Sequence, residues 1–243
     1  MKTIGILGGM SWESSAEYYR LINEEIAARL GGSHSAKCLL YSFDFHEMEG
    51  LQTAGRWKDA TGLMIDAALA LKGSGAQFLV IATNTMHKMA DDVEAATGIP
   101  LLHIADAAGE AITQSPSRRI GLLGTSFTME EPFYRERLER RYGLEVLIPE
   151  KADRETIHRV IYQELVAGKI VPQSKKEYQR IIALLVASGA EAILLACTEI
   201  GLLIKKNDCA VPLFDTTVIH AHAAVEYALE GSSRKSLRSM GEE

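Results

Sequence analysis

The sequence predicts an α/β fold of two pseudo-symmetric, Rossmann-like domains, each built around a parallel β-sheet. Short apolar runs alternate with amphipathic, charge-rich stretches, as strands and helices do in such sheets. Three sequence blocks also recur in the same order at nearly constant spacing: 4–9 as 120–125, 75–83 as 189–197, and 99–102 as 211–214. An internal repeat of this kind indicates two similar halves.

The elements follow from this pattern. Strands are expected at the unbroken apolar runs, because strands of a parallel sheet are buried on both faces. Amphipathic stretches predict helices over 16–30, 55–72, 175–188 and 218–229, and the last is expected to cross back and pack on the first half. We therefore expect a first domain at 1–115 with 211–230, a second at 116–210, and a disordered polar tail at 231–243.

Composition narrows the class of protein. The 243 residues carry a formal net charge of −6, without the basic stripe that would predict a nucleic-acid partner. The apolar runs are strand-length, too short to cross a membrane, and a strand begins directly at Lys2, which argues against a signal peptide. Three cysteines are too few for a disulfide framework, so we expect a reducing cytoplasm.

The repeat indicates where a site lies. Open parallel sheets bind ligands outside the carboxyl ends of their strands. Thr83 and Cys197 occupy equivalent positions at the ends of two apolar runs, so the two halves are expected to aim them at each other across an active-site cleft. A small molecule between them would meet one protic side chain on each face. Such a pair suits removal of a proton from one face of a carbon acid and its return on the other.

Cys197 has features of a catalytic base. The segment after it predicts a helix start, which would lower the thiol pKa toward physiological pH. Most free cysteines are instead buried and inert, and Cys38 and Cys209 fit that interpretation because neither ends a repeated strand.

Polar residues beside the two strand ends have two interpretations. Asn84, Thr85 and Thr198 are good helix caps, and the same helix starts would hold an α-carboxylate. The turn Gly8-Gly9-Met10-Ser11 lets the backbone approach a ligand closely but is not a dinucleotide fingerprint. The histidines are scattered, and His220 and His222 would diverge on a helix, so we expect no metal site.

Three ordered motifs resemble the aspartate/glutamate racemase family, and the resemblance covers nearly all of the chain. They are Gly8-Gly9-Met10-Ser11-Trp12-Glu13-Ser14, Thr83-Asn84-Thr85-Met86-His87 and Ala196-Cys197-Thr198-Glu199-Ile200-Gly201. The Cys-Thr-Glu triplet is similar to the aspartate-racemase branch. The resemblance implies a racemase that uses neither pyridoxal phosphate nor metal, acts on small amino acids, has two α/β domains and commonly forms a homodimer.

The resemblance also implies residue roles. Cys197 matches the cysteine that deprotonates the L-enantiomer, whereas Thr83 stands where the family's other cysteine normally stands. Six further positions match the substrate pocket: Met10, Ser11, Gln52, Asn84, Thr85 and Thr198. A threonine hydroxyl at position 83 is a far weaker acid than a thiol, so the resemblance implies a kinetic preference for L-substrates. The arginine and lysine usual in aspartate-specific members are missing from 46–49 and 164–168, which favours a broader range of substrate side chains.

Other functions are compatible with parts of the pattern. A single-cysteine decarboxylase or isomerase of the same superfamily would not need a proton donor on both faces. A non-catalytic, two-lobed binding protein would not need a cysteine at a helix start. A nicotinamide dehydrogenase would need the absent glycine fingerprint.

Overall fold

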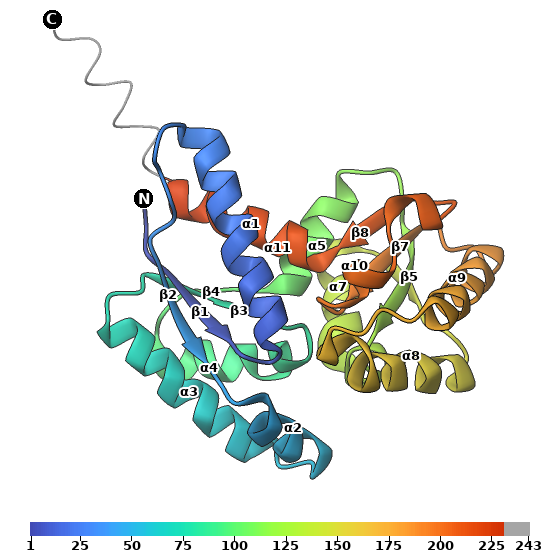
Figure 1. Ribbon diagram of the computed structural model, residues 1–243, viewed down its shortest axis with the longest axis horizontal. Coiled ribbons are helices and arrows are strands. Elements are labelled where there is room, and N and C mark those ends of the chain that lie inside the picture. Colours follow the sequence, from blue (N-terminus) through green and yellow to red (C-terminus); the bar gives the residue numbers. More distant parts are fainter. Residues whose placement is uncertain (231–243) are drawn as a thin grey trace, which may run out of the picture. The chain divides into compact units, whose positions relative to one another are not determined.

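The structure, a computed structural model, describes residues 1–230 and consists of strands and helices that alternate along the chain (Figure 1). The predicted tail at 231–243 lies outside the described residues. The strands form two four-stranded parallel sheets, which confirms the predicted α/β class. The strands are β1 (Ile4–Gly8), β2 (Cys38–Ser42), β3 (Phe78–Ile81), β4 (Leu101–Leu102), β5 (Arg119–Gly124), β6 (Glu145–Leu147), β7 (Ala192–Ala196) and β8 (Leu213–Asp215).

The two sheets share one topology. The first has the order β2-β1-β3-β4 and the second the order β6-β5-β7-β8. Strands β5, β6, β7 and β8 therefore occupy the places in the second sheet that β1, β2, β3 and β4 occupy in the first. The inner strands keep the repeat register, since Gly5 pairs with Leu79 where Gly121 pairs with Ile193. At both glycines a Cβ atom would come within 3 Å of the paired side chain. The internal repeat is therefore a repeat of sheet packing.

The helices that accompany the first sheet are α1 (Trp12–Leu30), α2 (Phe45–Thr53), α3 (Trp57–Gly73), α4 (Ala90–Thr97) and α11 (Thr216–Leu229). α1 begins before the predicted residue 16 because the Ser11 side chain accepts a hydrogen bond from the Ser14 N–H and caps the helix there. Gly9, just before this cap, has φ +84°, and a side chain at this position would collide with the Phe43 backbone.

α11 packs on the first sheet, as predicted. Its residues Ala221, Ala224, Val225 and Ala228 share a core with β1, β3 and α1. The backbone N–H of Lys2 also donates to the Ala228 carbonyl at 2.8 Å.

The second sheet is accompanied by more, shorter helices. They are the 3₁₀ segment η1 (Thr85–Met89), α5 (Ile104–Thr113), α6 (Ser126–Glu130), α7 (Pro132–Tyr142), α8 (Lys151–Gln163), η2 (Leu165–Ala167), α9 (Pro172–Ala187), α10 (Ile200–Leu203) and η3 (Lys206–Asp208). Their apolar faces and strands β5–β8 enclose a core of their own.

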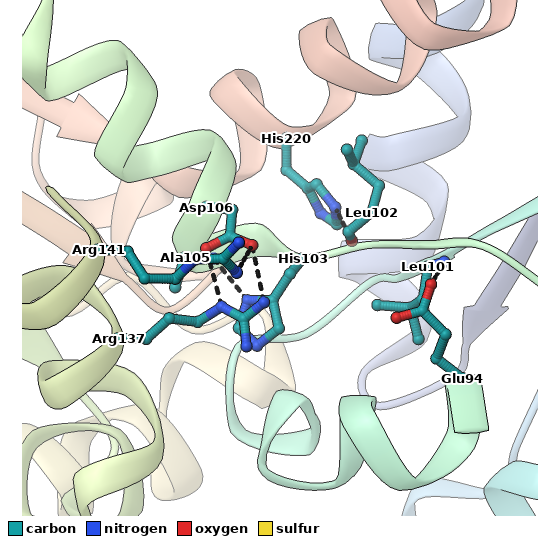
Figure 2. Close-up of polar contacts among 9 residues, drawn as sticks. All are labelled: Glu94, Leu101, Leu102, His103, Ala105, Asp106, Arg137, Arg141 and His220. Carbon is teal, nitrogen blue, oxygen red and sulfur yellow. Dashed lines mark hydrogen bonds and ion pairs between the residues drawn. The ribbon is translucent and has the colours of Figure 1, made fainter. Parts of the chain in front are cut away.

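The described chain groups into two compact units. Unit 1 contains residues 1–82, 89–102 and 220–230, and unit 2 contains 83–88 and 103–219. Residues 83–88, 103–115 and 211–219, assigned from the sequence to the first half, group with unit 2. α5 is held there by the carboxylate of Asp106, which accepts from Arg137 at 2.7 and 2.8 Å and from Arg141 at 2.8 Å (Figure 2). β8 pairs with β7.

Candidate active site

Thr83 lies two residues beyond the end of β3, at the start of a short segment that belongs to unit 2. Its side chain is partly exposed. Its carbonyl accepts a hydrogen bond from His87 Nδ1 at 2.8 Å, so the Nδ1 atom of His87 carries a proton. This contact joins His87 in η1 to the residue two before η1 begins, and it fixes the backbone from which the Thr83 hydroxyl projects.

The same segment is attached to the carboxyl ends of β5 and β7. Thr85 Oγ1 lies 3.0 Å from Oγ1 of Thr125, the residue that follows β5 and caps α6. Asn84 Nδ2 donates to Thr216 Oγ1 at 3.0 Å, and Thr216 donates to the carbonyl of Leu195 in β7 at 2.8 Å. Thr85 is thus anchored at the end of β5, and Asn84 is anchored to β7, the strand that leads to Cys197.

Cys197 directly follows β7 and is buried. Its thiol donates to Glu199 Oε2 at 3.1 Å, and the Thr198 hydroxyl donates to the same oxygen at 2.7 Å. The backbone N–H groups of Glu199 and Ile200 also point at the sulfur and favour its thiolate form. Glu199 is itself buried, so a carboxylate and a thiol share a site from which water is largely excluded.

The expected lowering of the Cys197 pKa is wrong. Burial raises the pKa of the thiol well above its usual range, and the negative charge of Glu199 raises it further. The helix expected to lower it, α10, has only four residues, and its N–H groups do not offset the loss of water. Cys197 is therefore a protonated thiol at neutral pH.

The remaining predicted pocket residues lie in unit 1. Met10 and Ser11 follow β1, and Gln52 is in α2; all three are buried. The Ser11 hydroxyl caps α1 and lies 3.1 Å from the Ser14 hydroxyl, which gives it a structural role. The other predicted site residues, Thr83, Asn84, Thr85, Cys197 and Thr198, all belong to unit 2.

Sequence reasoning missed two residues of this site. Glu199 was visible in the Cys-Thr-Glu triplet, and its spacing of two from Cys197 was the signal that could have found it. Thr216 follows β8, and no motif marks it, because its contact with Asn84 joins residues far apart in the chain.

Residues 1–230 contain neither a candidate metal-binding cluster nor a helix suited to span a membrane. No three His, Cys, Asp or Glu side chains in this range lie close enough together to hold a metal ion. None of the described helices is both long and apolar enough to cross a membrane.

Comparison with known proteins identifies the class. The family model for Asp/Glu/hydantoin racemases matches residues 7–224. The crystal structure of a candidate Asp/Glu racemase from Yersinia pestis is 54% identical, covering 94% of this chain and all of that chain, with a TM-score of 0.88. An aspartate racemase homologue from Pyrococcus horikoshii OT3 is 35% identical, covering 94% of this chain and 99% of that chain, with a TM-score of 0.80.

A further relative is the broad specificity amino-acid racemase RacX of Bacillus subtilis (strain 168). It is 24% identical over 67% of this chain and 69% of its own length. The two parallel sheets and these matches define an isomerase of the racemase type. The chain belongs to the Asp/Glu/hydantoin racemase family.

Proposed function

We propose that this chain is a cofactor-independent amino-acid racemase that moves protons at Cα with Cys197 on one face of the substrate and Thr83 on the other. The observation that carries the proposal is the hydrogen bond from the buried Cys197 thiol to the Glu199 carboxylate, at the strand end equivalent to that of Thr83. The carboxylate that accepts this hydrogen bond is placed to take the thiol proton when the base forms, and a protic group at the matching strand end supplies its counterpart.

The first step is formation of the base. Because the resting thiol is protonated, Glu199 Oε2 takes its proton along the 3.1 Å hydrogen bond. The N–H groups of Glu199 and Ile200 stabilise the thiolate left behind. The thiolate then takes the α-hydrogen of the L-substrate, and the electron pair of the broken C–H bond stays on Cα.

The second step returns a proton to the other face. The Thr83 hydroxyl donates its hydrogen to Cα, which inverts the configuration, and the alkoxide formed takes a proton from water. Cys197 keeps the proton taken from Cα, which restores the resting thiol, and Glu199 releases the proton it took in the first step, which neutralises the hydroxide left by water. In the reverse direction a threonine hydroxyl must act as the base, and it is a far weaker acid than a thiol. The D-enantiomer is therefore deprotonated more slowly.

The substrate range is proposed to be broad. No arginine or lysine occurs at 46–49 or 164–168. His46 and Glu47 in α2 are exposed, and Glu164 is engaged by the Ser174 hydroxyl at 2.6 Å. With no cation at these positions to hold a distal carboxylate, neutral amino acids of medium length compete with aspartate and glutamate. A homodimer, implied by the family resemblance, stays a prediction.

The test is a racemisation assay on dialysed protein with chelator and without pyridoxal phosphate. The panel comprises aspartate, glutamate, methionine, leucine and homoserine, with enantiomers separated by chiral chromatography. We expect the enzyme to racemise several amino acids of this panel, without a preference for aspartate by several orders of magnitude in kcat/KM. Activity that disappears with chelator and returns with metal would contradict the two-base mechanism. Decarboxylation or isomerisation of small acids, without racemisation, would favour the single-cysteine alternative.

A further inference from the structure

A chain of three groups joins the segment after β3 to the end of β7. The Leu195 carbonyl accepts from Thr216 Oγ1 at 2.8 Å, and Thr216 Oγ1 lies 3.0 Å from Asn84 Nδ2. Thr216 is completely buried and Asn84 is 2% exposed. All three residues belong to unit 2.

The direction of the hydrogen bonds in this chain is fixed by chemistry. A carbonyl oxygen can only accept, so the single hydroxyl hydrogen of Thr216 is donated to the Leu195 carbonyl. The Thr216 oxygen must then accept from Asn84, and only the amide nitrogen of Asn84 can donate. The orientation of the Asn84 amide is therefore set by Thr216, with Nδ2 toward Thr216 and Oδ1 directed away from it.

The Asn84 Oδ1 atom is left without a donor. It is buried, and no hydrogen-bond donor within residues 1–230 reaches it. A buried acceptor without a partner costs free energy that folding does not recover, so such an atom in a binding site indicates a ligand that donates. An α-carboxylate has no hydrogen to donate at neutral pH, whereas an α-ammonium group has three.

We infer that Thr216 is a positioning residue that holds the Asn84 amide so that Oδ1 accepts a hydrogen bond from the α-ammonium group of an amino-acid substrate. This inference rests on the proposed racemase function and makes one part of it more specific. It assigns Asn84 to the ammonium group, in place of the carboxylate suggested by its position at a helix start. The α-carboxylate is then held by other groups.

The decisive variant is Thr216→Val, which keeps the shape of the side chain and removes the hydroxyl. The Asn84 amide is then free to rotate, and contact with the ammonium group is lost in part of the population. Two ligands separate the possible causes: the amino acid that the enzyme racemises fastest, and the same molecule with hydrogen in place of its amino group. The first is measured by its KM and the second by its Ki as a competitive inhibitor.

We expect Thr216→Val to raise the KM of the amino acid roughly tenfold, the effect of one lost hydrogen bond, and to leave the Ki of the deaminated acid within about twofold. Thr216→Ser keeps a hydroxyl and should restore the KM. Thr97→Val is the matched control and should leave both constants unchanged, because Thr97 is a buried threonine whose hydroxyl donates to the Val93 carbonyl within α4.

Equal increases for both ligands, or no change in either, would overturn the inference. If Thr216→Val does not fold, Asn84→Leu completes the same comparison, because it removes Oδ1 directly and should change the same ratio. Wild-type protein that racemises no amino acid would instead refute the proposed function. If the wild type is active but neither variant changes the ratio of the amino acid's KM to the deaminated acid's Ki, only the role of Thr216 and Asn84 would be refuted.

Discussion

The ends of β3 and β7 occupy the same place in two sheets of one topology, yet they carry different acids. At β7, Cys197 is buried beside Glu199, with a carboxylate and two N–H groups directed at its sulfur. At β3, Thr83 is partly exposed, and the contact that holds it, from His87, is made to its carbonyl. The repeated fold therefore preserves the position of a protic group without preserving its acidity. A symmetric scaffold can in this way support an asymmetric proton transfer.

The largest effect is expected at the β7 end. Cys197→Ala should reduce proton exchange at Cα by ~10²–10⁴-fold, the usual contribution of a general base. Exchange is measured by NMR as loss of the α-proton signal in deuterium oxide. Cys38→Ala and Cys209→Ala are the matched controls and should change the rate little, because neither residue follows an inner strand of its sheet. A fully active Cys197→Ala enzyme would contradict the role of Cys197 as the base at the end of β7.

The pH dependence of kcat/KM tests the role of Glu199 beside Cys197. Because the pKa of the Cys197 thiol is raised, kcat/KM in wild-type protein should increase as pH rises above neutrality and the thiolate forms. Glu199→Gln removes a negative charge that opposes the thiolate, so the thiol pKa falls and this increase moves to lower pH. The maximal rate should also fall, roughly tenfold, because the proton acceptor is lost.

Glu199→Asp is the matched control, since it keeps the carboxylate and should keep the alkaline position of the profile. A Glu199→Gln profile identical in position and height to that of wild type would show that Glu199 has no part in activating the thiol.

Acid should weaken the packing around the first sheet. His220 lies in its core and accepts a hydrogen bond from the Tyr18 hydroxyl at Nδ1. Its Nε2 donates to the Leu102 carbonyl (Figure 2). Burial lowers the pKa of His220 to about 4 from its usual 6.5. The unfolded chain therefore binds a proton more readily, so stability is complete above the unfolded pKa and is lost as pH falls toward the folded pKa.

The expected loss between about pH 7 and about pH 5 is roughly 2 kcal/mol of unfolding free energy, by proton linkage. It is measured by urea unfolding at both pH values. His220→Gln offers the same donor and acceptor without titrating, so its stability should depend less on pH by about that amount. Equal pH dependence of the two proteins would show that His220 is not the group responsible.

The sequence predicted the inner strands of both sheets, the main helices and the two strand ends, because the repeat and the unbroken apolar runs are local signals. The state of Cys197 depends on burial by residues distant in sequence, and no local signal reports it. The same holds for Thr216, whose partners lie elsewhere in the chain. The grouping of α5 with unit 2 likewise depends on ion pairs from Asp106 to α7.

The most direct test of the central claim compares solvent-deuterium exchange at Cα from pure L- and pure D-substrate at early times. At equilibrium both directions must balance, so any asymmetry is kinetic. If the β7 end provides a thiolate and the β3 end only a hydroxyl, exchange into the L-substrate should be much faster than exchange into the D-substrate. Thr83→Cys should then raise the D-side rate by roughly 10²-fold, the scale of general-base catalysis. Equal early exchange from both enantiomers in wild-type protein would contradict the account and require another base on the Thr83 side.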